Sequence, residues 1–109
     1  MNRDDELWTR MCNLLFEMER KWVAGCGDDA AARLHRRMMQ VIDEAGYRIH
    51  NPLNEIYDET RTDVEASILQ DDSGHAHVMR IRTVLKPVIY RKTADESLSL
   101  VQRGVVIAG

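Results

Sequence analysis

The chain has 109 residues, of which 44% are hydrophobic and 30% are charged, and its formal net charge is −3. This length suits a single domain, and the balance of apolar and charged residues is typical of a globular protein rather than a disordered one. A slightly acidic chain has no general attraction for phosphate backbones, so the composition argues against nucleic-acid binding through overall charge.

The first residues contain no apolar segment typical of a secretory signal, and no run approaches the ~18 apolar residues of a membrane span. We therefore expect a cytoplasmic protein that binds no membrane. The cysteines are Cys12 and Cys26. In that compartment we expect both to be reduced thiols rather than a disulfide.

Helical periodicity dominates residues 4–23, where two apolar stripes run side by side. The first stripe contains Leu7, Met11, Leu14, Leu15, Met18 and Trp22, and the second contains Trp8, Cys12, Phe16 and Val23. A lone amphipathic helix needs only one buried face. The two stripes therefore predict that this helix is covered from more than one side.

A second helix is expected over residues 29–45. Gly25 and Gly27 break the first helix, Asp28 can cap the second, and Gly46 is expected to end it as a C-cap. Its expected inner face is Ala31, Leu34, Met38, Val41, Ile42 and Ala45, and its expected outer face is Arg33, Arg36, Arg37, Asp43 and Glu44.

A two-helix hairpin is an incomplete core, and a second copy related by two-fold symmetry would complete it. We expect a homodimer in which two hairpins form a four-helix bundle. The alternative is that the sheet of the same chain covers the wide face of the first helix. The expected dimer interface is Leu7, Trp8, Met11, Leu15, Phe16, Met18, Leu34, Met38 and Val41.

Beyond residue 50 the apolar residues alternate, which indicates strands. Strands over 63–69 and 75–85 are expected to form an antiparallel hairpin closed by the sequence DDSG. The register then places Val64, Glu65, Ala66 and Asp63 opposite Ile81, Arg80, Met79 and Arg82, respectively. This register gives one apolar face and one face of opposite charges.

Further short strands are expected at 88–91, 97–102 and 104–109. Pro87 is expected to bend its strand or to lie at an edge, and Gly104 to mark a bulge or bend. Acidic residues are concentrated in 55–72 and basic residues in 75–92. Tyr90 near the basic strand is compatible with nucleic-acid binding, but the predicted pairing of the two blocks explains the charges without it.

No motif for catalysis is present, since the chain lacks GxSxG, GxxxxGK[ST] and HExxH patterns. Asp58 and Asp63 are interpreted as turn-capping and cross-strand residues rather than a catalytic pair. His75 and His77 would share one face of a strand, with His50, Cys12 or Cys26 as conceivable further ligands, but a single short spacing is weak support for zinc. We expect no enzyme, no metal and no cofactor.

The junction between helices and strands resembles the start of the β-domain of GrpE-type nucleotide exchange factors. The matching residues are Gly46, Pro52, Tyr57, Asp58, Asp63 and Val64, and near the end Arg103, Val105 and Ile107. The resemblance is to a short, divergent member without the long N-terminal stalk helix of the family. It implies an α+β fold with a dimerising helical hairpin at 1–46 and a small β-domain, or wing, at 47–109.

The resemblance also implies a function, which is to bind the ATPase domain of a DnaK-type chaperone and promote release of ADP. The alternatives are a homodimeric protein-interaction adaptor without exchange activity and, less favoured, a nucleic-acid-binding module. The wing residues expected to contact the chaperone are Arg80, Arg82, Val84, Lys86, Pro87, Ile89 and Arg103.

Overall fold

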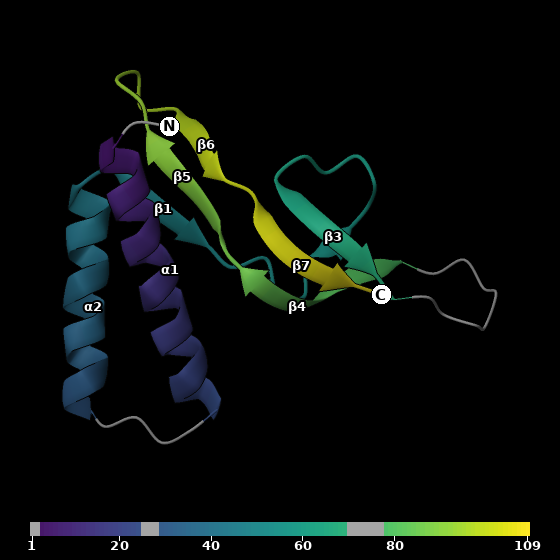
Figure 1. The fold of residues 1–109 in the computed structure, drawn as a ribbon, viewed down its shortest axis with the longest axis horizontal. Helices are drawn as coiled ribbons and strands as arrows, with labels where there is room; N and C mark the ends of the chain where they lie inside the picture. Colours follow the sequence, from purple (N-terminus) through teal and green to yellow (C-terminus); the bar gives the residue numbers. More distant parts are fainter. Residues whose placement is uncertain (1–2, 25–28, 70–77) are drawn as a thin grey trace.

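The computed structural model describes residues 3–24, 29–69 and 78–109. Two helices come first and strands follow (Figure 1). The helices are α1 (Arg3–Ala24) and α2 (Asp29–Glu44). The strands are β1 (Tyr47–His50), β2 (Ile56–Tyr57), β3 (Val64–Ile68), β4 (Met79–Lys86), β5 (Val88–Lys92), β6 (Leu98–Gln102) and β7 (Gly104–Ala108).

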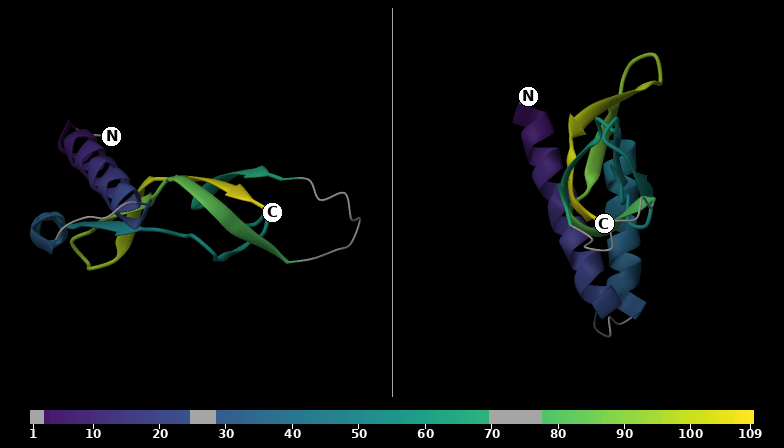
Figure 2. Two further views of the ribbon diagram at one scale, coloured as in Figure 1. Left: turned by 90° about the horizontal axis from the view of Figure 1, so that it is seen from below. Right: turned by 90° about the vertical axis from the view of Figure 1, so that its right-hand side faces the viewer.

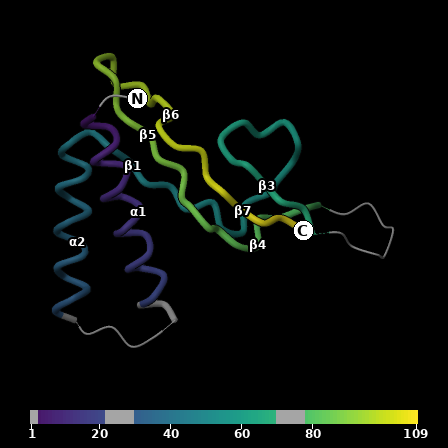
Figure 3. Tube along the Cα trace, in the orientation of Figure 1, coloured from purple at the N-terminus to yellow at the C-terminus, as the bar shows by residue number. Residues whose placement is uncertain are grey.

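The strands form two sheets, with the orders β1-β5-β6 and β2-β4-β7-β3. Both sheets contain parts of the same two chain segments, because β4 continues into β5 across Pro87 and β6 continues into β7 across Arg103 (Figure 3). The predicted interruption at Pro87 is confirmed. Proline has no amide hydrogen to donate to a strand ladder, which suits the point where the segment passes between sheets.

The two helices lie side by side at one end of the molecule, next to the β1-β5-β6 sheet (Figure 1). The second sheet extends away from them, as the side view in Figure 2 shows. The helices end within one residue of the predicted positions: α2 stops at Glu44, and Gly46 has a φ of 92°, which favours glycine. The predicted boundary at residue 46 therefore falls at the junction of helix and sheet.

One face of α1 packs on strands of its own chain. Cys12 and Leu15 share a buried cluster with Ile42 of α2, Tyr47 of β1 and Ile89 of β5. Phe16 belongs to a second cluster, which it forms with Val64, Ile81, Val84, Val88 and Val106 of the sheets. The helices and the sheets therefore share their apolar core.

The predicted four-helix bundle is wrong. The structure shows two helices followed by two sheets, and strands of the same chain pack against Trp8, Cys12 and Phe16 of the second stripe of α1. Leu15 is 1% exposed and Phe16 is 4% exposed, so neither is available to a second copy. Trp8 is half-buried and stacks on Tyr47 with ring centroids 5.9 Å apart. The alternative, coverage by the chain's own sheet, holds for these residues of the stripe.

The other predicted interface residues have different surroundings. Met38 is half-buried beside the cluster of Leu15. The exposed members are Leu7, Met11, Met18, Leu34 and Val41. Together with Leu14, which is 58% exposed, Leu7, Met11 and Met18 form an uncovered apolar stripe along α1.

The inner face of α2 differs from the prediction. Leu34 and Val41 face solvent, whereas His35 is buried and its Nε2 lies 3.2 Å from the carbonyl oxygen of Leu15. A polar residue on the buried side obscured the true stripe, which runs through His35, Met39 and Ile42. The predicted outer face is confirmed, since its five charged residues are exposed.

The predicted hairpin of residues 63–69 with 75–85 is also wrong. β7 lies between β3 and β4, and β3 pairs with it in parallel, with Val64 opposite Gly104. β7 is apolar along its whole length, which suits a central strand better than an edge. The DDSG turn, His75 and His77 lie outside the described residues, as do Cys26 and the predicted break at Gly25, Gly27 and Asp28.

A glycine is required at position 104, where the β6–β7 segment passes from one sheet to the other close to Val88. A Cβ atom there would lie 2.9 Å from Cγ2 of Val88 and 3.3 Å from the carbonyl oxygen of Lys86. We expect Gly104→Ala to lower the free energy of unfolding by about 1–3 kcal/mol, because an added methyl group overpacks a buried site. Denaturant unfolding monitored by circular dichroism measures this change.

A double variant isolates the cause. Val88→Ala removes the methyl group that the new Cβ would meet, so Gly104→Ala should cost less in that background than in the original chain. Equal costs in both backgrounds, or a Gly104→Ala variant as stable as the original chain, would contradict the steric explanation.

Candidate partner-binding surface

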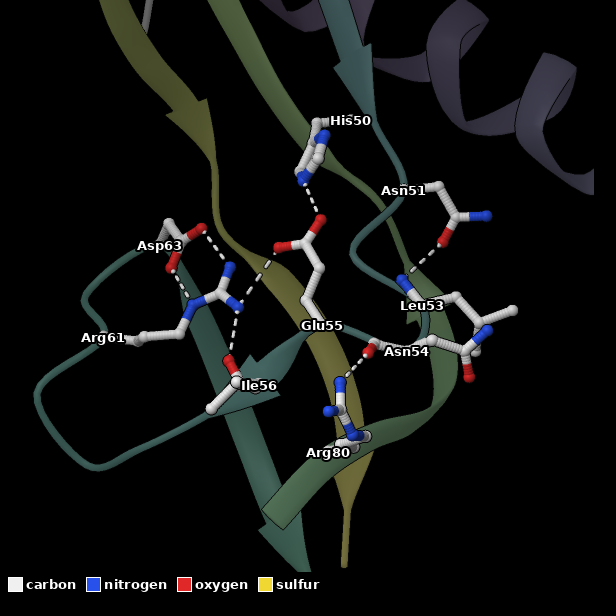
Figure 4. Close-up of polar contacts among 9 residues, drawn as sticks. All are labelled: His50, Asn51, Leu53, Asn54, Glu55, Ile56, Arg61, Asp63 and Arg80. Atoms are coloured by element: carbon white, nitrogen blue, oxygen red, sulfur yellow. Dashed lines mark hydrogen bonds and ion pairs between the residues drawn. The ribbon is translucent and has the colours of Figure 1, made fainter. Parts of the chain in front are cut away.

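A polar network organises the segment between β1 and β3 (Figure 4). Arg61 is its centre, donating from Nε to Oδ1 of Asp63 at 3.0 Å and from Nη2 to Oδ2 at 2.7 Å. Its Nη1 also donates to the carbonyl oxygen of Ile56 at 3.0 Å and lies 3.2 Å from Glu55. The Arg61 side chain is only 18% exposed, so these contacts are shielded from water.

The network connects this segment to β1 and β4. Nε2 of His50, at the end of β1, lies 2.6 Å from Oε2 of Glu55. The backbone amide of Ile81 donates to the carbonyl oxygen of Glu55, and Ile81 in turn accepts from the amide of Asn54, both at 2.9 Å. The segment is therefore held along the outer side of β4, where the predicted partner-binding residues begin.

The acids of this segment have altered pKa values. The bidentate contact with Arg61 lowers the pKa of Asp63, and the same contact raises that of Arg61. Asp63 thus pairs with Arg61 and not with Arg82, which corrects the predicted cross-strand pair. Asp58 accepts from the amide of Thr60 at 2.8 Å, as expected for a turn cap, and hydrogen bonds from Thr60 lower its pKa.

The predicted partner-binding residues divide into a buried and an exposed group. Val84 is 5% exposed, Ile89 is 0% exposed and Pro87 is fully buried, so these three belong to the core and cannot form a contact surface. The register of β4 shifts between Ile81 and Thr83 and again beyond Val84. These bulges change which side chains point inward, and simple alternation could not anticipate them.

The exposed group is basic and consists of Arg80, Arg82, Lys86 and Arg103. Arg103 donates to Glu65 at 3.1 Å and to the carbonyl oxygen of Val64 at 2.8 Å. Arg80 and Arg82 each donate to backbone carbonyls, of Asn54 and Gly109, at 3.0 Å. Within the described part of the chain, Arg80, Arg82 and Lys86 have no acidic partner.

This outcome corrects the predicted neutralisation of the basic strand by the acidic one. Because β7 separates β3 from β4, the acids of β3 do not lie opposite the cations of β4. The three cations on β4 are therefore available to an acidic partner. We call Arg80, Arg82 and Lys86 the basic surface.

A second polar cluster, which sequence reasoning missed, positions α1. The buried carboxylate of Asp5 accepts from the hydroxyl of Tyr47 on β1 and from Arg91 on β5. The Tyr47 hydrogen bond lowers the pKa of Asp5, and burial raises the pKa of Tyr47 to about 12. These groups satisfy one another, so the cluster holds the helix on the sheet rather than binding a ligand.

Chemistry at the other reactive groups is limited. Cys12 is a free, buried thiol whose pKa burial raises to about 11, so it is a poor nucleophile. No three histidine, cysteine or acidic residues gather as a metal site in the part of the chain that the structure describes. Neither described helix combines the length and apolar character that crossing a membrane requires.

The chain matches no protein-family model, no curated protein and no solved structure.

The Arg61 network leads to a prediction about acid stability. Because the folded state lowers the pKa of Asp63, the carboxylate stabilises the fold above its unfolded pKa of about 4 and loses this effect as pH falls through the lower folded value. We expect Asp63→Asn to lower the free energy of unfolding by about 1–3 kcal/mol at pH 7, with the difference shrinking below pH 4.

Denaturant titrations at pH 7, 5, 4 and 3 measure this difference. Glu59→Gln is the control, since Glu59 is an exposed acid of the same segment and should change stability little at any pH. A pH-independent difference between the Asp63→Asn variant and the original chain would contradict the role given to the ionised pair.

Proposed function

We propose that this chain is a GrpE-like cochaperone that binds the ATPase domain of a DnaK-type chaperone in the cytoplasm and promotes release of ADP. It acts without catalysing a reaction and without a cofactor. The chain would bind the open form of the ATPase more tightly than the closed form and so shift the population toward nucleotide release.

The observation that carries the proposal is the order of elements with the family-like residues at their junctions. Gly46 ends the helical hairpin with a positive φ, and Pro52 is buried in the turn after β1. Tyr57 packs against the second core cluster, and Asp58 caps the following turn. Arg103 joins β6 to β7, the last strand, which is apolar along its length.

The basic surface supports a protein partner. Its cations have no acidic partner among the described residues, and they lie on a strand that pairs with β2 and β7 rather than on a loop. Charge complementarity of this kind accelerates association and selects the orientation of the partner. The buried Val84, Pro87 and Ile89 support the shape of this surface and are not part of the contact.

Release of fluorescently labelled ADP from the cognate DnaK-type ATPase tests the proposal. We expect the chain to accelerate release, and Arg80→Glu with Lys86→Glu to weaken this acceleration about tenfold or more at low salt, because each change places a like charge against an acidic surface. Arg36→Glu is the control, since Arg36 is exposed on α2.

The salt dependence adds a second readout, because the difference between the charge-reversal variant and the original chain should shrink as salt screens exposed charges. Unchanged ADP release at a saturating concentration of the original chain would refute exchange activity.

A second candidate function is a protein-interaction adaptor without exchange activity. The uncovered stripe of Leu7, Met11, Leu14 and Met18 favours it, because an apolar patch of this kind commonly marks a protein contact. Such an adaptor would form a stable complex with the ATPase and leave ADP release unchanged. The homodimer stays a prediction, and a sedimentation-velocity mass equal to one chain at micromolar concentration would contradict it.

A further inference from the structure

A hollow of about 210 Å³ lies between α1, the turn after β1 and the middle of β4. Its walls come from three parts of the chain that are distant in sequence. The residues used below are Phe16, Arg20, Asn51, Leu53, Arg82 and Val84.

The floor of the hollow is apolar and belongs to the core. Phe16 and Val84 are 4% and 5% exposed, and both belong to the second core cluster. Leu53 stands at the rim and is 44% exposed. A ligand entering here would place methylene groups on a surface that already exists in the free protein, so little ordering would be needed.

The charged groups of the hollow are both cationic. Arg20 comes from α1 and places its guanidinium carbon 5.8 Å from the ring centroid of Phe16. Arg82 comes from β4, and its Nε donates to the carbonyl oxygen of Gly109 at 3.0 Å. Neither arginine forms an ion pair with an acid in the described ranges, and no acid lines the hollow.

The contacts of each arginine leave donors free. The Nε bond of Arg82 holds its side chain, whereas its Nη1 and Nη2 atoms form no hydrogen bond within the described residues. The guanidinium of Arg20 lies over the Phe16 ring, and no hydrogen bond within the described residues occupies its donors. Arginine donors arranged in this way suit a carboxylate, which can accept two parallel hydrogen bonds from one guanidinium.

We propose that this hollow binds the side chain of a glutamate presented by a protein partner. The carboxylate lies between Arg20 and Arg82, and the methylene groups lie on Phe16 and Val84. The size favours one side chain, because pockets for whole small molecules usually measure about 300–1,000 Å³. The apolar floor and Leu53 favour a glutamate with apolar neighbours over a free inorganic anion.

This inference deepens the proposed function, because Arg82 also belongs to the basic surface and the ATPase would supply the glutamate. It does not require nucleotide exchange, since any partner with an accessible glutamate could use the hollow. Binding to the hollow is therefore tested with a peptide rather than with the chaperone.

The experiment is an NMR titration of the labelled chain that follows its backbone amides and the Nε–H signals of its arginines. The probe is acetyl-Gly-Leu-Glu-Leu-Gly-amide, and the matched peptide has Gln in place of Glu. We expect saturable shifts of the Arg20 and Arg82 side-chain signals and of the Asn51 and Leu53 amides with the Glu peptide. The Gln peptide should bind at least tenfold more weakly.

Variants assign the binding to the hollow. Arg20→Gln and Arg82→Gln should each weaken binding of the Glu peptide at least tenfold, whereas Arg36→Gln on α2 should bind as the original chain does. Arg20→Gln keeps the Arg82 contact with Gly109, and the spectrum of each variant reports whether it is folded. If only Arg82→Gln weakened peptide binding, and its spectrum showed a disturbed fold, the result would count against the site.

Three results would overturn the inference. Equal binding of the Glu and Gln peptides would show that the carboxylate is not recognised. Shifts of the Arg80 signal as large as those of Arg20 and Arg82 would indicate attraction to the basic surface in general. Saturation of the same signals by inorganic phosphate at lower concentration would assign the hollow to a free anion. If an Arg20→Gln variant still accelerates ADP release, exchange activity does not depend on the hollow. A failed glutamate site would then leave the proposed function standing.

Discussion

The burial of one face of α1 on the strands of its own chain is the interaction on which the rest of the structure depends. Leu15 packs with Ile89 of the first sheet, and Phe16 shares a cluster with Val88 of the first sheet and Val84 of the second. Each such side chain contributes about 1.5–3 kcal/mol when it is fully buried. This packing sets the rotation of α1, and the rotation leaves the stripe of Leu7, Met11, Leu14 and Met18 on the outside.

The two sheets are coupled because two continuous segments cross from one to the other. Pro87 and Gly104 mark the points where these segments pass between the sheets. The side chain of Gln102 donates to the carbonyl oxygen of Pro87 at 2.9 Å. Gln102 also exchanges two hydrogen bonds with Asn13 of α1, both at 3.0 Å. Gln102 therefore links α1 to the point where the β4–β5 segment passes between the sheets.

The polar networks explain how a chain of this size holds long irregular segments in place. Arg61 gathers contacts from Asp63, Glu55 and Ile56, so the segment before β3 needs no regular structure. Asp5 contacts residues 42 and 86 positions away along the chain. No local sequence pattern indicates partners that are so far apart along the chain, so these clusters could not be predicted from spacing.

Local chemistry in the sequence was enough to determine several features. The period of apolar residues located both helices, Gly46 marked the end of α2, and alternation located β3, β4, β5, β6 and β7. Short β1 and β2 were missed, because Tyr47–His50 and Ile56–Tyr57 are too short for alternation to be visible.

Only the tertiary structure decided which faces meet. Periodicity shows that α1 has two apolar stripes, but both stripes satisfy the same pattern, and the choice depends on which strands lie nearby. β7, and not β4, pairs with β3, because strand order depends on contacts between distant segments. The bulges of β4 then buried Val84 and left Arg82 exposed beside Arg20, a pairing created by packing across 62 residues of sequence.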